Sequence, residues 1–518
     1  MPRPTALVKK SLIFVHRWLG VALCLLFLMW FASGIVMMYW DFPSVGAQDR
    51  LDHLPVLDGS KIQVSPADAF AKLGSKQPPG QIRLNTFDGR PVYRFRAGRA
   101  ERLIYADTGQ EQTEVSRELI QRTAASWTGQ PIGAASVQSL DEVDQWTVQG
   151  GLRNVRPLWK YSWPDGQQVY VSGATGEVVQ YTTSSSRFWS YLGAIPHWMY
   201  FTPLRKRQVE WNQFVIWTSA IGTVSAILGI AIGLWMYSPA KRYRYAGTPT
   251  SIPYAGQKRW HTILGLIFGL TAATWAFSGF LSMDPFPTGQ KGRGAPGALP
   301  NIPGALRGRF EVASFEAKPP AKAVAQLAGL KVKELEFSSF AGDPVYLAQL
   351  EGGESRIVPI SGDPITQFDN NRVMDVVRKA AGPGSLAELR MMNDYDAYYL
   401  DRHHERPLPV VLAVLNDAES TRYYIDPKTG RQVGGYSSSR WVTRWLYHGL
   451  HSMDFPWLYK YRPLWDIVVI SFMLGGTALC VTSLILAWRV LRRKVAGLFV
   501  DRPGRDEATL GEDLAVTE

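Results

Sequence analysis

The sequence predicts a membrane α+β protein made of two repeated halves, each with two transmembrane helices and one large lobe outside the membrane. Three observations predict this class. Four long apolar stretches occur within 518 residues. Two constant spacings relate residues of the first half to residues of the second. The segments between the first and second stretches, and between the third and fourth, carry the patterns of helices and strands.

The apolar stretches are long enough to cross a bilayer, whose core needs about 20 helical residues. No charged residue lies in the middle of any of them, which is rare for buried helices of soluble proteins. The first stretch is too long for a signal peptide and its counterpart lies mid-chain, so we expect both to be retained. The four stretches are 12–39, 214–237, 262–283 and 464–488.

The repeat pairs histidines. A shift of 245 positions (261 minus 16) places His16 on His261, within HRWLGVALCLLFLMWFASGIVMM and HTILGLIFGLTAATWAFSGFLSM. A shift of 254 positions (451 minus 197) places His197 on His451. Each half therefore supplies one histidine at each of two membrane edges.

Lysine and arginine predict the orientation, because cytoplasmic loops of membrane proteins are rich in both. Basic residues flank the first stretch, fill the connection between the second and third, and follow the fourth. We therefore expect both termini in the cytoplasm and both lobes outside. These flanks account for much of the net charge of +12, so nucleic-acid binding is not needed to explain it.

These patterns divide the chain into eleven segments. They are a cytoplasmic N-terminus (1–11), transmembrane helix 1 (12–40), lobe 1 (41–186), an interfacial helix (187–208), transmembrane helix 2 (209–238), a cytoplasmic loop (239–260), transmembrane helix 3 (261–284), lobe 2 (285–439), an interfacial helix (440–462), transmembrane helix 4 (463–489) and a cytoplasmic tail (490–518).

Each lobe reads as two tandem units of a helix and antiparallel strands. The first unit opens on a helix with proline at its start, at Pro66 and Pro320. Strand-like runs follow, such as QIRLNTF and KELEFSSF, with turn signals at Asp88 and Gly342. The second units begin near 117 and 373 and end in VYVSGATGEVV and YYIDPKTGRQV.

The paired histidines predict a metal cofactor. A neutral imidazole is a good ligand for haem iron, and two histidines on facing helices can hold one haem. The repeat predicts the pairs His16 with His261 and His197 with His451, hence two haems about 30 Å apart along the helices. His448 lies three residues before His451 on an α-helical face and is the alternative ligand.

A covalently attached c-type haem is excluded, because C-x-x-C-H is absent and the two cysteines, Cys24 and Cys480, lie within apolar stretches. A histidine at a membrane edge is also a common interfacial residue, so the ligand interpretation competes with a simpler one. Four basic residues are candidates to pair with haem propionates: Arg17 and Arg259 border the inner histidines, and Lys206 and Lys460 border the outer ones.

Other residues carry weaker signals. His403 and His404 lie in an external DRHHERP turn, where solvated loop residues are the simpler interpretation and contact with substrate or metal the alternative. His53 stands alone and receives no role. The matched glycines Gly20 and Gly265 are expected to permit close helix approach or to make room for a porphyrin.

The second-lobe strand that ends in Y-x-D-x-x-T-G, as YIDPKTG after a helix and a hairpin, resembles the PepSY domain, and the first lobe has YVSGATG at the matched place. The membrane half-repeats with HRWLG-like and LH-like motifs resemble the PepSY-associated transmembrane family, over nearly the whole chain. Members include bacterial inner-membrane reductases that act on ferric siderophores and bind haem b. The resemblance implies periplasmic lobes, an inner-membrane location, and a ferric siderophore or another ferric chelate as partner.

The sequence thus predicts a di-haem b oxidoreductase, a transmembrane ferric reductase whose catalytic residues are not identifiable from the pattern. No G-x-G-x-x-G, P-loop or flavin domain occurs, so the electron donor would be a separate flavin system or membrane quinol. Two alternatives remain: a haem-free PepSY protein that regulates a peptidase, and a transporter built on the repeats.

Overall fold

The structure, a computed structural model, describes residues 4–75, 79–98, 100–285, 299–401 and 404–499. The chain divides into two compact units. We call the first the membrane unit; it comprises residues 1–32, 217–277 and 468–518. We call the second the lobe unit; it comprises residues 33–216 and 278–467.

Four helices are long and apolar enough to span a membrane, as the sequence predicted. None has a proline inside it, so the backbone hydrogen bonds run unbroken through each apolar stretch. Three of the helices begin several residues before the predicted spans, and the fourth ends after its span. They are α1 (Pro4–Met37), α8 (Gln208–Met236), α9 (Gly256–Ser282) and α15 (Leu464–Phe499).

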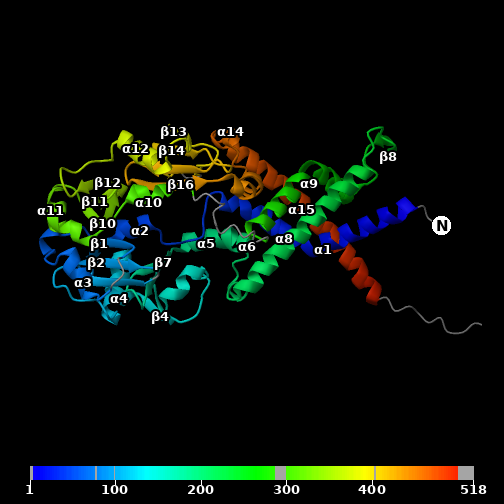
Figure 1. Cartoon of the computed structure of the whole chain (residues 1–518). Coiled ribbons are helices and arrows are strands. Elements are labelled where there is room, and N and C mark those ends of the chain that lie inside the picture. Colours follow the sequence, from blue (N-terminus) through cyan, green and yellow to red (C-terminus); the bar gives the residue numbers. More distant parts are fainter. Residues whose placement is uncertain (1–3, 76–78, 99, 286–298, 402–403, 500–518) are drawn as a thin grey trace, which may run out of the picture. The chain divides into compact units, whose positions relative to one another are not determined.

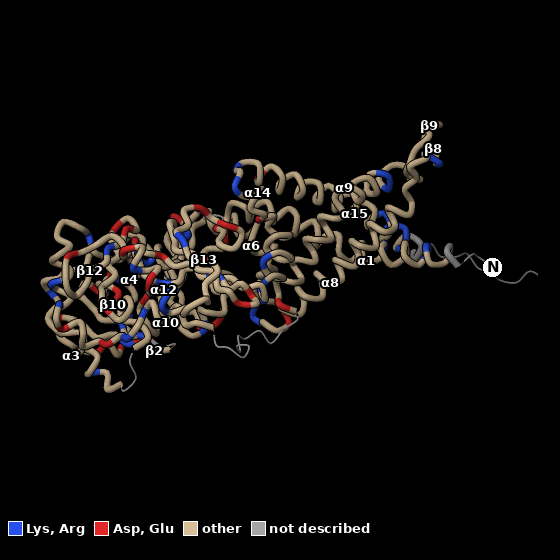
Figure 2. The backbone as a smooth tube through the Cα atoms, turned by 45° about the horizontal axis from the view of Figure 1, so that its top comes forward, with Lys and Arg blue, Asp and Glu red and all other residues tan. Residues whose placement is uncertain are grey.

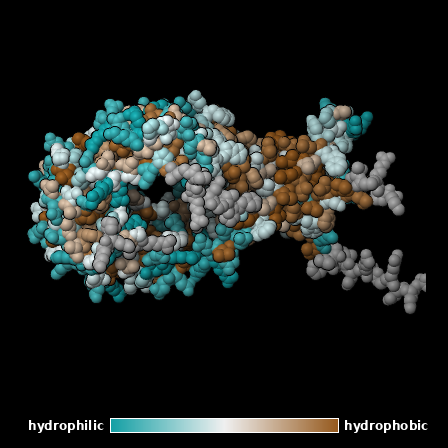
Figure 3. All heavy atoms as spheres, in the orientation of Figure 1, coloured by the Kyte–Doolittle hydropathy of each residue, from teal (hydrophilic) through white to brown (hydrophobic). Residues whose placement is uncertain are grey.

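The described part of the membrane unit carries lysine and arginine but no aspartate or glutamate. Figure 2 shows these basic residues at the helix ends near the N-terminus and β8, and Figure 3 shows an apolar surface over the helices. The connection from α8 to α9 contains the hairpin of β8 (Tyr243–Tyr245) and β9 (Thr248–Thr250). Arg259 of α9 holds this hairpin, since its Nη1 donates to Thr250 Oγ1 at 2.9 Å.

Glycines bring the membrane helices into close contact at positions other than Gly20 and Gly265. A Cβ at Gly222 of α8 would lie 2.9 Å from the Phe27 ring of α1, and one at Gly476 of α15 would collide with the Phe31 ring. A Cβ at Gly20 would meet nothing within 4 Å, and one at Gly265 only Leu479 at 3.9 Å. The close contacts therefore lie on α8 and α15.

The lobe unit contains one six-stranded sheet and two four-stranded sheets (Figure 1). The six strands run in the order β12, β11, β10, β1, β2, β3 and are all antiparallel. Their bounds are β1 (Gln81–Phe87), β2 (Arg90–Ala97), β3 (Ala100–Tyr105), β10 (Val332–Phe340), β11 (Asp343–Leu350) and β12 (Ser355–Pro359). One face packs an apolar core with the short helices α3 (Pro66–Lys72) and α11 (Pro320–Ala325).

The six-stranded sheet joins the two predicted lobes, which the sequence had suggested were separate. Strand β1 of the first lobe pairs with β10 of the second, with Arg83 opposite Glu336. Asn85 Nδ2 donates to Glu334 Oε2 at 2.7 Å across this junction. Lobes 41–186 and 285–439 therefore form one body through backbone pairing and buried polar contacts.

The two four-stranded sheets each pack against a helix of 12 residues. The first contains β4 (Ser136–Leu140), β5 (Leu158–Ser162), β6 (Gln168–Ser172) and β7 (Val178–Thr182), with α4 (Arg117–Thr128). The second contains β13 (Leu386–Met392), β14 (Val410–Leu415), β15 (Arg422–Asp426) and β16 (Arg431–Tyr436), with α12 (Asn370–Ala381).

The Thr-Gly turns end on the six-stranded sheet. Gly176 and Gly430 both have positive φ, 70° and 65°. A Cβ at Gly176 would lie 3.0 Å from the Phe87 ring, and one at Gly430 would lie 2.7 Å from the Phe340 ring. Both the backbone conformation and the close approach therefore require glycine.

The two predicted interfacial helices, 187–208 and 440–462, are broken into short segments. The first contains α5 (Ser184–Leu192), α6 (Ala194–Trp198) and α7 (Thr202–Arg205). The second contains a π-helix (Val442–Gly449), α13 (Leu450–Ser452) and α14 (Pro456–Tyr459). Each segment turns at a methionine of positive φ, Met199 at 55° and Met453 at 52°, two residues after its histidine.

Candidate functional site: two histidine pairs

Two pairs of histidines face one another, one in each unit. In the membrane unit the ring centres of His16 on α1 and His261 on α9 lie 6.2 Å apart, with the rings tilted by 36°. In the lobe unit the ring centres of His197 on α6 and His451 on α13 lie 6.0 Å apart, with the rings at 68°. These are the pairings that the repeat predicted.

The His16 ring is held by α8. Its Nδ1 lies 3.0 Å from the carbonyl oxygen of Ser225. A carbonyl only accepts hydrogen bonds, so Nδ1 carries the proton and Nε2 keeps its lone pair. The ring also rests on Gly229, where a Cβ would lie 2.7 Å from its Cε1. Gly229 thus leaves space that any side chain would fill.

The His261 ring is held by α15. Its Nδ1 lies 3.2 Å from Thr482 Oγ1 and 3.3 Å from Ser483 Oγ. Both hydroxyls donate their protons to the Leu479 carbonyl, at 2.7 and 2.9 Å. They therefore act as acceptors toward the ring, so Nδ1 is protonated and Nε2 again keeps its lone pair.

The second pair has serine partners. Ser33 Oγ lies 3.1 Å from His197 Nδ1, and Ser278 Oγ lies 3.0 Å from His451 Nδ1. The two serines correspond by the same 245-residue shift that relates His16 to His261. The sequence comparison contained this match but did not reveal its role, because a small hydroxyl in an apolar helix is also common packing.

His448, the alternative ligand, is not placed beside His197. It belongs to the π-helix, so the spacing of an α-helix that would put it on one face with His451 does not apply. Its ring packs on Tyr447 at 4.6 Å and is exposed. Tyr447 in turn lies 5.6 Å from the His451 ring.

A buried ion pair braces the segment that carries His451. Arg444 Nη1 lies 2.9 Å from Asp454 Oδ1, and its Nη2 donates to the Asp454 carbonyl at 3.0 Å. Arg444 also donates to the carbonyl of Ala397, in the loop between β13 and β14. Burial raises the pKa of the Asp454 carboxyl, and the Arg444 guanidinium opposes that rise. The second sheet is thereby tied to the histidine segment.

The loop between β4 and β5 makes the corresponding contact in the first half. Gln145 Nε2 donates to the Tyr200 carbonyl at 2.6 Å, three residues after His197. The same side chain accepts from Thr202 Oγ1 at 2.8 Å. Both histidine segments are therefore anchored to a loop of a four-stranded sheet.

The spacing of both pairs fits one metal ion between two imidazoles. A metal–imidazole bond is about 2.0 Å, and the ring centre lies about 1.2 Å beyond the bound nitrogen, so two ligands on opposite sides of one iron have ring centres about 6.4 Å apart. The observed 6.2 and 6.0 Å agree with this value. The anchored Nδ1 atoms and the space at Gly229 fit the same arrangement.

Three of the basic residues proposed as propionate partners contact protein groups. Arg17 lies over the Phe14 ring at 5.6 Å. Lys206 Nζ lies 2.6 Å from a Glu142 carboxylate oxygen. Arg259 binds Thr250, as described above, and lies over the Tyr245 ring at 5.3 Å. Pairing with propionates stays a prediction for all four.

The other histidines have different surroundings. The His53 ring stacks on Trp127, with centres 3.8 Å apart. His404 lies against Tyr395 at 5.2 Å and has a φ of 58°, while His403 lies outside the described residues. Among the described residues, no group of three or more His, Cys, Asp or Glu side chains forms a metal cluster.

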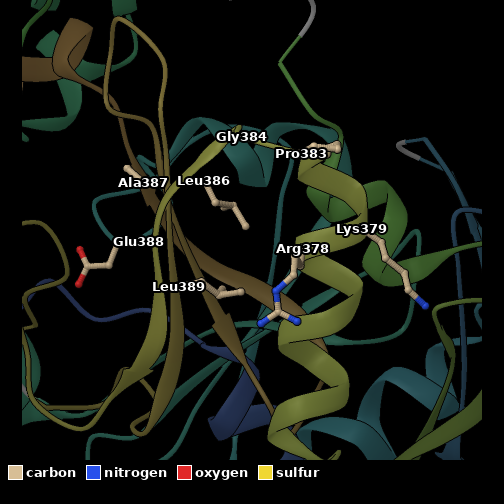
Figure 4. Close-up of a pocket in the computed structure, with 9 residues that line it drawn as sticks. Arg378, Lys379, Pro383, Gly384, Leu386, Ala387, Glu388 and Leu389 are labelled. Atoms are coloured by element: carbon tan, nitrogen blue, oxygen red, sulfur yellow. The ribbon is translucent and has the colours of Figure 1, made fainter.

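A pocket also lies between α12 and β13, away from any histidine (Figure 4). Arg378 extends along the gap between helix and strand, while Glu388 points away from it. The remaining lining is mostly aliphatic or glycine, with Leu386 and Leu389 on the strand. The lining thus combines two cationic side chains, Arg378 and Lys379, with an apolar wall, and contains no group that would carry redox chemistry.

No protein-family model matches the chain, and no curated protein matches it. The functional argument therefore rests on the histidine pairs and on the resemblance stated above.

Proposed function

We propose that the protein is a bacterial inner-membrane di-haem b oxidoreductase that passes electrons to a ferric chelate, most simply a ferric siderophore, on the periplasmic side. The observation that carries the proposal is the recurrence of one geometry: two histidine pairs, each at the spacing of two axial ligands. A single facing pair of histidines is compatible with ordinary packing. Two pairs at equivalent positions of a repeated sequence argue for a cofactor at each.

The proposed topology follows from charge. The described membrane unit is purely basic, and such ends face the cytoplasm. His16 and His261 would then hold the haem nearer the cytoplasm, and His197 and His451 the haem nearer the periplasm. Both termini would be cytoplasmic, and the lobe unit would lie in the periplasm.

The side chains have defined tasks in this proposal. The four paired imidazoles would hold haem iron through Nε2, and their Nδ1 partners would fix the ring orientations. Bound haem supplies reversible one-electron redox chemistry. One electron delivered to the chelate converts Fe(III) to Fe(II), and chelators with hard oxygen ligands hold Fe(II) less tightly, so reduction releases the metal.

The electron donor would be a separate cytoplasmic flavin system or membrane quinol, because the sequence contains no nucleotide-binding motif. The lobe unit would supply the surface for the chelate. The resemblance to the PepSY-associated transmembrane family, which extends over lobes and helices alike, supports the assignment of the lobe unit as the surface for the chelate.

The test uses the purified full chain in detergent. The protein is reduced with dithionite, freed of excess reductant, and mixed with ferric ferrioxamine in the presence of a ferrous-specific chromophoric chelator. We expect the reduced haem bands to disappear as the ferrous complex appears, with two electrons delivered per chain. A haem-bearing protein that stays reduced would exclude this substrate class. A haem-free chain would favour the regulatory or transporter alternatives.

A further inference from the structure

The two histidines of the membrane unit are held by different groups, although they occupy matched positions. The shift of 254 places Ser225, Leu228 and Gly229 of α8 on Leu479, Thr482 and Ser483 of α15. In the first half a main-chain carbonyl binds the ring and a glycine makes space for it. In the second half two hydroxyls stand at the positions of Leu228 and Gly229, and both face the His261 ring.

The hydroxyls change what His261 can bind. The carbonyl of Leu479 corresponds to that of Ser225 by the same shift. It already accepts hydrogen bonds from Thr482 and Ser483, at 2.7 and 2.9 Å. His261 therefore contacts hydroxyl oxygens, at 3.2 and 3.3 Å, whereas His16 has a main-chain carbonyl as its acceptor. The other pair lacks this contrast, because both of its histidines bind a serine.

We propose that Thr482 and Ser483 are positioning residues that hold His261 with Nδ1 protonated and make it a weaker electron donor to its metal than His16. The proposal rests on the proposed haem at this pair. A strong acceptor at Nδ1 makes an imidazole more basic at Nε2 and stabilises the ferric state. A hydroxyl oxygen is a weaker hydrogen-bond acceptor than an unshared peptide carbonyl, so it polarises the ring N–H less.

The consequence is a higher reduction potential for the haem of the membrane unit than a carbonyl-bound pair would give. Neither hydroxyl touches the reacting atoms, so both act through His261. Removing them leaves the Leu479 carbonyl free for the ring proton, which reproduces the arrangement of His16 and Ser225.

The test compares three full-length proteins by spectroelectrochemical titration: wild type, Thr482→Val with Ser483→Ala, and Thr482→Ser with Ser483→Thr. We expect the first double variant to keep its haem content and to lower one of two midpoint potentials. The second double variant keeps both hydroxyls and should restore the wild-type value. An unchanged or higher potential in the first variant would overturn the proposal.

A second measurement separates this inference from the proposed function. In haem-free protein labelled with 15N-histidine, the 15N chemical shift of His261 Nδ1 should be that of a protonated nitrogen. The same chemical shift should change in the first double variant. A wild-type protein that never binds haem would refute the proposed function. If haem is bound but neither the shift nor the potential responds, only the roles of Thr482 and Ser483 fail.

Discussion

The ring centres of His16 and His261 lie 6.2 Å apart, on helices separated by more than 200 residues of sequence. Neither half of the chain can build this pair alone. If the pair holds one haem, replacing either histidine by alanine should remove the same spectral component and leave the other haem in place.

His448 provides the matched control for this experiment. It lies three residues before His451 of the second pair, and its ring packs on Tyr447. His448→Ala should retain both haems, whereas His451→Ala should lose one. Loss of a haem in His448→Ala, with retention in His451→Ala, would reassign the ligand. Absorption spectra of the oxidised and reduced proteins distinguish these outcomes.

Ser33 and Ser278 should matter equally, because each binds the Nδ1 atom of one histidine at nearly the same distance, 3.1 and 3.0 Å. Loss of such a partner typically costs about 10- to 100-fold in metal-site affinity. Ser33→Ala and Ser278→Ala should each weaken haem retention by a factor in that range, measured by transfer of haem to apomyoglobin. Ser282→Ala is the control, since Ser282 is exposed and bonds only its own helix carbonyl at Gly279. Equal loss in all three variants would contradict the prediction.

Gly229 should be intolerant of even one methyl group. A Cβ there would lie 2.7 Å from His16 Cε1, so the ring must shift from its position. We expect Gly229→Ala to lose most of one haem while the chain still inserts and folds. Gly20→Ala is the matched control on α1, because its Cβ would meet nothing within 4 Å. The haem-to-protein ratio of both variants, read from the Soret and 280 nm bands, measures this loss. A full haem complement in Gly229→Ala would contradict a haem site at His16 and His261.

Arg94 should stabilise the lobe unit through a buried ion network. Its side chain is 1% exposed and its Nη1 lies 3.1 Å from Glu101 and 2.7 Å from Glu177. Removing one partner of a buried pair typically costs about 3 kcal/mol or more. Arg94→Met should therefore lower the thermal unfolding temperature clearly. Arg102→Met, which breaks the more exposed pair with Glu111, should change it little.

The same network gives the lobe unit a defined pH dependence. Burial tends to raise the pKa of Glu101, but Arg94 and Arg83 outweigh it and hold that pKa below its ordinary 4.5. A lowered pKa in the folded state adds stability above the unfolded value, and this stability is lost as the pH falls through the folded value. Wild type should lose stability below about pH 4.5, and Arg94→Met should lose less over that range. Unfolding temperatures measured from pH 7 to pH 3 test the sign.

Much of the architecture was predictable because it is local. The spans follow from uninterrupted apolar runs, and strand β1 coincides with the alternating run QIRLNTF. The histidine pairs could be predicted because two constant spacings match His16 with His261 and His197 with His451.

The rest depends on contacts between distant residues. Nothing in the local pattern of Arg83 or Glu336 indicates that β1 and β10 would pair and merge the lobes. His448 lies in a π-helix, so the α-helical spacing that suggested it as an alternative to His451 does not apply there. The roles of Thr482 and Ser483 required knowing which helix lies against α9. Hydroxyls at matched positions of an apolar span were the available signal.

The most direct test of the central claim is the pyridine haemochrome assay on the full chain purified from haem-replete cells. The account predicts two b-type haems per chain, with a low-spin spectrum typical of two histidine ligands. A result of one haem per chain would support a site at only one histidine pair and would contradict electron transfer through two haems. A colourless protein would contradict the account.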